Sequence, residues 1–404
     1  MPSPILRACA GLAAVTLGAC SAPYHPPVFI EPNPVFPGLI DLAAGKPVDV
    51  LMVHGICSHD ASWASDVVRT LTRDINANLP SPALRPKAEA GIEVVSSTVG
   101  TPYGSLRFNG LIWSPLTREL KRQLCYDETD KSAICQDAPP FTPTRAKFNA
   151  RAKDLLIDDC VPDALIYEGV SHDAMRQRMR EAVMQVLEKD GNAPEAPLVV
   201  VAESMGSKYL FDTLLRMTQE VPDSHAASLA QRAVDRMQYL VMAGNQIPLL
   251  ALADQQTAAG LSAATGAATG ASAATGATAP HASAAPPGGD SLQQLLQMRR
   301  AWTSEARNAS TAGAQAAPAA PTTQAAQTHL VLIAFSDPSD VLSYTLQREK
   351  YARDGIDVYN ILVSNGPTYL GLLERPDTAH LNYLENPDVA RLITCGQPTS
   401  TRCK

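Results

Sequence analysis

Short apolar runs alternate along the chain with segments whose apolar residues recur every three or four positions. Runs rich in Val, Ile and Leu predict strands, which we place at 48–53, 92–97, 198–202, 238–242, 330–335 and 356–363. Helical stripes fall between them, on Met175, Met179, Val183 and Val186 and again on Leu210, Leu214 and Met217. This alternation predicts an α/β fold, in which helices cover both faces of a mostly parallel sheet.

One segment interrupts the alternation. Of the 33 residues from Thr257 to Gly289, 31 are Ala, Gly, Ser, Thr or Pro, and a similar tract covers 308–328. Such side chains offer too little apolar area to offset the entropy of ordering the chain. We therefore predict a low-complexity insertion at 254–328, between two parts of one domain at 48–253 and 329–404. Residues 290–307, between the tracts, suit a helix that is either docked or transient.

The first residues predict export. Arg7 precedes an apolar run from Ala8 to Ala19 that is too short to span a bilayer permanently. The run ends in Leu17-Gly18-Ala19-Cys20, which resembles a bacterial lipobox. The resemblance implies that 1–19 are a removed signal peptide and that Cys20 is lipidated, and the Ser after it points to the outer membrane. The alternative is an ordinary signal peptide with Cys20 as a free thiol or disulfide partner.

Seven prolines between residues 21 and 47 predict that 20–47 form an extended tether. If Cys9 is removed and Cys20 is acylated, six of the eight cysteines remain, and an even number in an oxidising compartment favours disulfides. Spacing and elimination suggest Cys125 with Cys135, Cys395 with Cys403, and Cys57 with Cys160. Buried free thiols are the alternative.

Composition narrows the function classes. The 404 residues suffice for one large domain or two ordinary ones. The 33 basic and 40 acidic side chains give a formal charge of -7, which leaves no excess of cations to bind nucleic-acid phosphates. After the first residues, no apolar run is long enough for a membrane span, so we expect a soluble body.

A candidate nucleophile follows the strand expected at 198–202. The chain there reads Ala202-Glu203-Ser204-Met205-Gly206, and a helical stripe comes next. Small residues two positions to each side of a serine let a strand and a helix approach closely at a sharp turn. The motif resembles the G-x-S-x-G nucleophile elbow of the α/β-hydrolases, with Ala202 at the first glycine position. The resemblance, which covers 48–395 apart from the insertion, implies an α/β-hydrolase fold and a nucleophilic Ser204.

The strand at 48–53 runs into His54-Gly55-Ile56-Cys57. This sequence resembles the H-G loop that follows the third strand of α/β-hydrolases and supplies one N–H of the oxyanion hole. The resemblance implies that the backbone amides of Ile56 and Met205 are the two donors. It also implies that His54 shapes the loop and is not the general base.

The acid and the base are expected after the last two long strands. The loop after 330–335 holds Asp337 and Asp340. Asp340 precedes an aliphatic pair and so resembles the family's acid more closely, which leaves Asp337 as a turn or helix cap. His380, the only histidine after the strand at 356–363, lies in a segment that resembles the family's catalytic histidine loop.

These roles imply a serine esterase or lipase acting on a small-molecule or lipid ester. Ser204 would attack the acyl carbonyl, His380 would transfer the proton, and Asp340 would support the imidazolium. The mechanism needs no metal and no organic cofactor, and no common motif for either occurs in the sequence. The competing hypothesis is a non-catalytic envelope lipoprotein that uses the same fold for binding or scaffolding.

Overall fold

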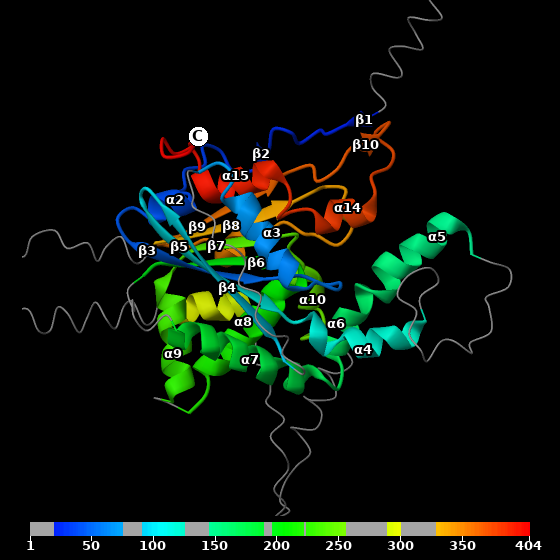
Figure 1. Cartoon of the computed structure of the whole chain (residues 1–404), viewed down its shortest axis with the longest axis horizontal. Helices are drawn as coiled ribbons and strands as arrows, with labels where there is room; N and C mark the ends of the chain where they lie inside the picture. Colours follow the sequence, from blue (N-terminus) through cyan, green and yellow to red (C-terminus); the bar gives the residue numbers. More distant parts are fainter. Residues whose placement is uncertain are drawn as a thin grey trace, which may run out of the picture.

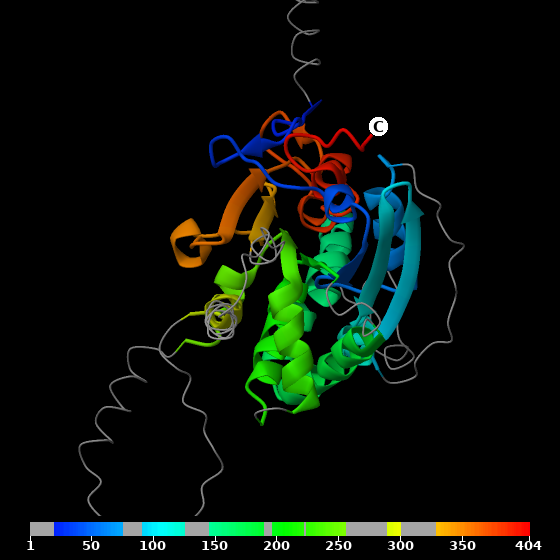
Figure 2. The ribbon, with the colours of Figure 1, turned by 90° about the vertical axis from the view of Figure 1, so that its left-hand side faces the viewer.

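An eight-stranded mixed sheet forms the centre of the computed structural model, which describes residues 20–75, 91–125, 145–189, 196–221, 224–255, 289–299 and 329–404. The strand order is β2-β9-β8-β7-β6-β3-β5-β4. The six inner strands are parallel, whereas β2 and β4 are antiparallel to their neighbours at the two edges. Figure 2 shows the long β4 and β5 at one edge and β9 toward the other. The prediction of an α/β fold with a mostly parallel sheet is confirmed.

The strands of this sheet are β2 (Val28–Phe29), β3 (Pro47–Val53), β4 (Glu93–Thr101), β5 (Gly104–Ile112), β6 (Leu198–Glu203), β7 (Met237–Ala243), β8 (Leu330–Ser336) and β9 (Ile356–Leu362). A separate pair joins β1 (Cys20–Ser21) to β10 (Thr368–Tyr369). The principal helices are α2 (Leu39–Leu42), α3 (Ala61–Leu71), α7 (His172–Lys189), α8 (Met205–Thr218), α9 (His225–Arg236), α14 (Pro376–Leu381) and α15 (Pro387–Cys395). The other α-helices are α4 (Arg118–Lys121), α5 (Lys147–Ala152), α6 (Val161–Glu168), α10 (Ile247–Leu250) and α13 (Arg348–Tyr351).

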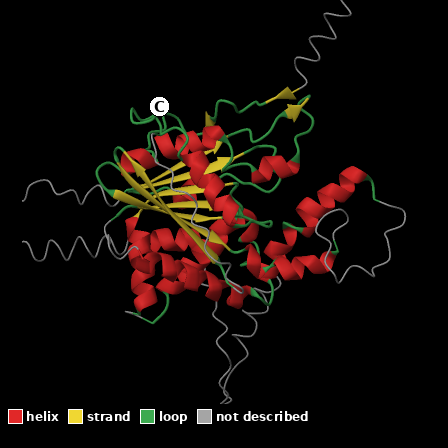
Figure 3. Cartoon of the chain, in the orientation of Figure 1, coloured by secondary structure: helices red, strands yellow, loops and turns green. Residues whose placement is uncertain are grey.

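Each face of the sheet packs against its own layer of helices (Figures 1 and 3). Side chains alternate along β3: Leu51 and Val53 join the core under α7, α8 and α9. Val50 and Met52 join the core under α2, α3 and α15. The period of two residues along a strand thus supplies both cores, which explains why β3, β6, β7 and β8 are apolar at nearly every position.

The six predicted strands are present near their predicted bounds, but β5 lies inside a segment without a predicted strand. Its sequence contains Ser105, Arg107, Asn109 and Gly110, which obscure the apolar alternation. Arg107 forms an ion pair with the buried Asp49 of β3, at 2.5 Å. A Cβ on Gly110 would lie 2.7 Å from the Cβ of Ala64 in α3, so this position requires glycine.

The expected extended tether is instead folded onto the domain over much of its length. β2 pairs with the edge strand β9, and Phe36, Leu39 and Ile40 are buried in the core that α3 and α15 cover. The prolines suggested an extended spacer, but the apolar side chains between them are numerous enough to anchor the segment.

Within the predicted insertion, residues 291–299 form a helix docked on the core. Leu292, Leu295 and Leu296 are buried against the layer of α8 and α9. The guanidinium of Arg299 donates to the carbonyl oxygens of Val234, at 3.2 Å, and Met237, at 3.1 Å. Of the two alternatives from the sequence, the docked helix is confirmed. The low-complexity tracts lie outside the described residues.

Disulfides join Cys57 to Cys160 and Cys395 to Cys403, which confirms two of the suggested pairs. The third suggestion involves Cys135, which lies outside the described residues. The signal peptide predicted at 1–19 lies outside them as well. Among the helices that are described, none combines the length and the apolar composition needed to cross a membrane.

Candidate active site

Ser204 lies in the sharp turn between β6 and α8, with φ 50° and ψ −129°. Non-glycine residues rarely adopt positive φ, and such strain persists only where the surroundings impose it. The surroundings here are tightly packed. A Cβ on Gly206 would lie 2.3 Å from the carbonyl oxygen of His54, and one on Gly55 would lie 2.7 Å from the Cβ of Ser204. Both positions therefore require glycine.

The side chains of Ser204, His380 and Asp340 form one chain of hydrogen bonds. His380 lies on α14, and its Nε2 is 3.0 Å from Oγ of Ser204. On the other side of the ring, Nδ1 is 2.8 Å from Oδ2 of Asp340, in the loop after β8. Ser204 and His380 are each 2% exposed and Asp340 is 5% exposed. The structure thus brings together the three residues singled out in the sequence.

The hydrogen bonds also assign the tautomer of His380. The amide nitrogen of Gln246 can only donate, and it lies 3.3 Å from Nε2 of His380. Nε2 is therefore an acceptor, able to receive the hydroxyl proton of Ser204. Nδ1 carries the ring proton and donates it to Asp340.

Two further donors hold Asp340. The hydroxyl of Tyr383 donates to Oδ2 at 2.9 Å, and the backbone N–H of Leu342 donates to Oδ1 at 2.9 Å. Burial, followed by the nearby charge of Asp340, raises the pKa of Tyr383 well above its usual value, so the phenol remains a donor. A Cβ on Gly244 would lie 2.8 Å from Cε2 of Tyr383, and the φ of Gly244 is +64°. The tyrosine therefore packs directly on the backbone after β7.

Asp337 has a different environment. Its carboxylate accepts the backbone N–H of Ser339 at 2.8 Å and that of Asn365 at 2.6 Å. Within the described part of the chain it forms no hydrogen bond to His380. Its contacts are those of a turn cap that also fastens the chain after β9 to the chain after β8.

The loop from His54 to His59 lies beside Ser204. His54 is fully buried and stacks on Trp113, with ring centroids 4.7 Å apart. Its Nε2 accepts the backbone N–H of Trp113 at 2.9 Å, so Nδ1 carries the proton and donates to the Gly55 carbonyl at 2.8 Å. Burial lowers the pKa of His54 well below its usual value. The neutral imidazole of His54, which forms a hydrogen bond at each nitrogen, therefore fixes the shape of the loop.

The two predicted amide donors remain available. Met205 is the first residue of α8, where a backbone N–H has no partner within the helix. Among the residues that the structure describes, the N–H of Ile56 donates to no other group. The polar groups on either side of Ile56 do have partners: the Gly55 carbonyl accepts from His54, and the Cys57 N–H donates to Asp163.

Glu203 precedes Ser204 and is buried. The indole N–H of Trp63 lies 3.3 Å from its Oε2. Burial raises the pKa of the Glu203 carboxyl to about 7, although His380, Trp63 and the backbone N–H of Gly55 act in the opposite direction. Glu203 occupies a variable position of the serine motif, so the motif gave no reason to single it out.

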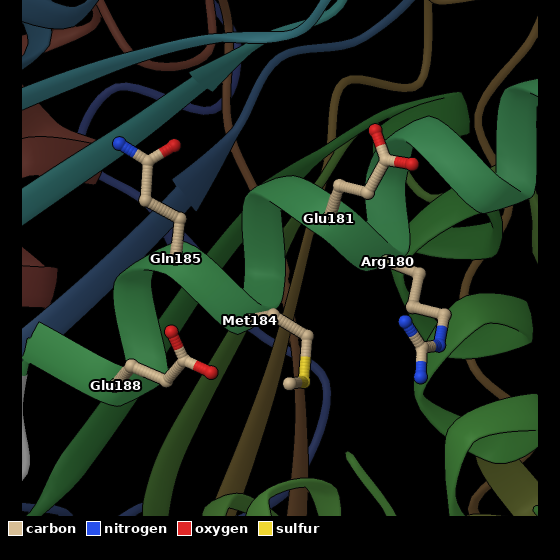
Figure 4. A pocket seen from close by; sticks show the side chains of 5 residues that line it. All are labelled: Arg180, Glu181, Met184, Gln185 and Glu188. Carbon is tan, nitrogen blue, oxygen red and sulfur yellow. The ribbon is translucent and has the colours of Figure 1, made fainter.

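The described residues contain two other features that could suit a ligand. Within the described ranges, the one cluster with metal-ligand spacing is Cys57, Asp159 and Cys160, and its two sulfurs are joined in a disulfide. A surface hollow of about 460 Å³ lies beside α7 (Figure 4). Its lining consists of Arg180, Glu181, Met184, Gln185 and Glu188. None of the candidate site residues lines it.

Comparison with protein-family models, curated protein sequences and solved structures found no match for this chain.

Proposed function

We propose that the chain is a serine hydrolase with an α/β-hydrolase fold, which cleaves carboxylic esters through an acyl-enzyme intermediate. The observation that carries the proposal is the hydrogen-bonded chain Ser204–His380–Asp340, with Ser204 strained at a strand-to-helix turn. Nucleophile, base and orienting acid in this geometry define the reaction class more directly than sequence position does.

Each residue has one role in the proposed mechanism. Ser204 attacks the acyl carbonyl while His380 Nε2 takes the hydroxyl proton, and the same nitrogen returns it to the leaving alcohol. Asp340 keeps Nδ1 protonated and stabilises the imidazolium. The amides of Ile56 and Met205 receive the negative charge that develops on the carbonyl oxygen. A water molecule, activated by His380, then attacks the acyl-enzyme and releases the acid.

The alternative is a non-catalytic lipoprotein that uses the fold for binding or scaffolding. Such a protein has no need for a strained serine or for a histidine with an unprotonated nitrogen facing it. The intact hydrogen-bonded chain therefore favours an enzyme. A carboxylic ester, from a small molecule or a lipid, is preferred over a peptide by analogy with the superfamily.

The test is labelling by a fluorophosphonate together with hydrolysis of short p-nitrophenyl esters. Ser204→Ala should abolish labelling and lower kcat by up to about 10⁶, because members of a triad act as a unit. Ser62→Ala, which changes an exposed serine on α3, is the matched control and should retain both. Equal turnover in the native chain and in folded Ser204→Ala would refute the proposal.

We also propose that acyl chains on Cys20 hold the protein at the outer membrane, where it faces the periplasm or the cell surface. The structural support is the position of β1. Its backbone pairs Cys20 with Tyr369 of β10. The turn that follows exposes Leu370, Leu372 and Leu373, of which Leu372 is 86% exposed. Exposed apolar side chains beside the predicted acylation site suit contact with lipid.

A further inference from the structure

We propose that the buried ion pair of Asp163 and Lys121 positions the loop of Ile56 so that its backbone N–H faces the reacting carbonyl oxygen. Asp163 and Lys121 are positioning residues here, since they act through the backbone of the loop. The inference rests on the proposed esterase function. It adds a set of residues that neither the serine motif nor the H-G loop contains.

The contacts reach the loop directly after Ile56. The backbone N–H of Cys57 donates to Oδ2 of Asp163 at 2.7 Å. The next residue, Ser58, donates its backbone N–H and its hydroxyl to the two carboxylate oxygens of Asp159, at 2.9 and 2.6 Å. Both aspartates lie at or just before the start of α6. Two successive peptide groups of the loop are therefore fixed to one short segment.

Lys121 completes the anchor from α4. Its Nζ lies 3.1 Å from Oδ2 of Asp163, 3.0 Å from Oδ1 of Asp159 and 2.7 Å from the carbonyl oxygen of Asp159. Asp163 is 0% exposed and Lys121 is 1% exposed, so both charges are removed from water. Burial raises the pKa of Asp163 to about 6, and Lys121 acts against that rise. A buried ion pair is weak evidence for added stability, so its placement against a functional loop calls for another explanation.

The remaining backbone polar groups near Ile56 also have hydrogen-bond partners. Its carbonyl oxygen lies 3.2 Å from Nε2 of His59, while the carbonyl of Cys57 accepts the hydroxyl of Ser114 at 3.2 Å. The N–H of His59 donates to the same hydroxyl at 2.8 Å. Among the described residues, the Ile56 N–H is left without an acceptor between these bonds. A carbonyl oxygen of the substrate can therefore accept a hydrogen bond from this N–H.

The loop is held in a conformation that it would not adopt alone. Cys57 has φ 78°, in the left-handed region that few residues other than glycine occupy. Its disulfide to Cys160 keeps the loop attached to the start of α6. The covalent link fixes proximity, whereas the bond from Cys57 N–H to Asp163 fixes the orientation of the peptide groups around Ile56.

The charges also matter for the reaction. The carboxylates of Asp163 and Asp159 lie close to the loop and would oppose the negative charge that develops on the substrate oxygen, and Lys121 offsets both. Removing Lys121 alone should therefore harm turnover. Replacing both residues with neutral ones that keep an acceptor for Cys57 N–H should restore part of it.

The experiment measures kcat and KM for a short p-nitrophenyl ester in Asp163→Ala, Lys121→Met and Lys121→Met/Asp163→Asn. Fluorophosphonate titration gives the concentration of active sites. Asp163→Ala should lower kcat per active site about 10²-fold with little change in KM, since a small displacement of a donor has an effect of this size. Lys121→Met should also lower kcat, and the double variant should recover at least tenfold over Lys121→Met.

A second readout reports on the oxyanion position. A trifluoromethyl ketone, which adds to Ser204 and places an oxyanion in the same position, should lose affinity in parallel with kcat. Glu220→Gln is the control, because it breaks a partly buried ion pair with Arg180 that lies between α7 and the end of α8. It should change neither measurement.

The outcomes separate the two proposals. Unchanged kcat per active site and unchanged inhibitor affinity in Asp163→Ala would overturn the positioning role, even if the variant were less stable. The esterase proposal would then stand on its Ser204-dependent turnover. A native chain that shows no Ser204-dependent turnover would overturn both.

Discussion

Asp340 and Asp337 lie three residues apart in one loop, yet their carboxylates serve different partners. Asp340 accepts from His380, Tyr383 and the backbone of Leu342. Asp337 accepts the backbone N–H groups of Asn365 and Ser339, at 2.6 and 2.8 Å. Asp340 therefore orients His380, the proposed base, and Asp337 fastens two loops together.

Replacing these aspartates tests that division. Asp340→Asn should lower kcat by up to about 10⁴ with the fold intact, because the amide favours the wrong imidazole tautomer and cannot stabilise the cation. Asp337→Asn should lower stability by about 1 kcal/mol and leave most of the activity. Ester hydrolysis and thermal unfolding measure both effects. A crippled Asp337→Asn beside an active Asp340→Asn would reverse the assignment.

Glu203 predicts a dependence of stability on pH. Its folded pKa of about 7 lies above the ordinary glutamate value of 4.5, so its favourable contribution to stability is complete below pH 4.5 and is lost as pH rises to about 7. Glu203→Gln removes this titration. The stability of the variant relative to the native chain should therefore rise by roughly 3 kcal/mol between those pH values.

Urea unfolding of both proteins across that pH range measures the difference. Glu181→Gln, an exposed change on α7, is the control. Hydrogen bonds from Gln177 and Arg178 lower the pKa of Glu181, so this variant should not gain stability relative to the native chain as pH rises. A constant difference between Glu203→Gln and the native chain would show that Glu203 titrates normally.

Whether a site residue can be predicted depends on how far along the sequence its interaction partners lie. Ser204 and its glycine follow from the close approach of β6 and α8, which a short motif records. The hydrogen bond from Tyr383 to Asp340 spans 43 positions, and that from Cys57 to Asp163 spans 106. No local pattern encodes such pairs. Tyr383 is nevertheless only three residues beyond His380, so its position was a usable signal.

At the scale of elements, the apolar strands β3, β6, β7 and β8 were predictable because both of their faces need apolar side chains. β5 and β2 were not. The polar Arg107 of β5 is satisfied by Asp49, a partner that becomes adjacent only when the sheet forms. β2 is two residues long and depends on its pairing with β9. In both segments, tertiary contacts stabilise a strand that the local sequence pattern does not predict.

The docked helix at residues 291–299 yields a prediction at this scale. Leu295 is buried against the core, so Leu295→Ala should cost about 2–4 kcal/mol through lost contacts and a cavity. In a domain of this size, that lowers Tm by roughly 5–10 °C. Calorimetry measures the shift. Gln297→Ala, an exposed change on the same helix, should leave Tm nearly unchanged.

Replacing the whole of 257–325 with a Gly/Ser linker should destabilise the protein in the same way, because it removes the docked helix. A linker that retains 289–299 should preserve Tm, since loop length alone costs little. Equal Tm in the native chain and the full replacement would show that the helix contributes no stability.

At the scale of the whole molecule, the parallel inner strands bring the site together. β6, β8 and β9 run in the same direction, so the segments that follow them meet at one edge of the sheet. Ser204 follows β6 and Asp340 follows β8, while His380 lies beyond β9. The order in which Ser204, Asp340 and His380 follow their strands was predicted from the sequence, whereas the substrate depends on side chains around the edge that no motif specifies.

Cys20, in the β1–β10 pair, is the residue through which we expect the whole protein to be attached to the membrane. Cys20→Ser removes the thiol that acylation requires, so the protein should leave the membrane fraction and lose incorporation of labelled palmitate. Acyl chains contribute about 0.8 kcal/mol per buried CH₂, far more than a few exposed leucines in a turn can replace. Fractionation of cells that express each form measures the effect, and Ser21→Ala, which keeps the thiol, should remain membrane-bound. Full membrane retention of Cys20→Ser would show that another segment, such as the turn after β10, holds the protein.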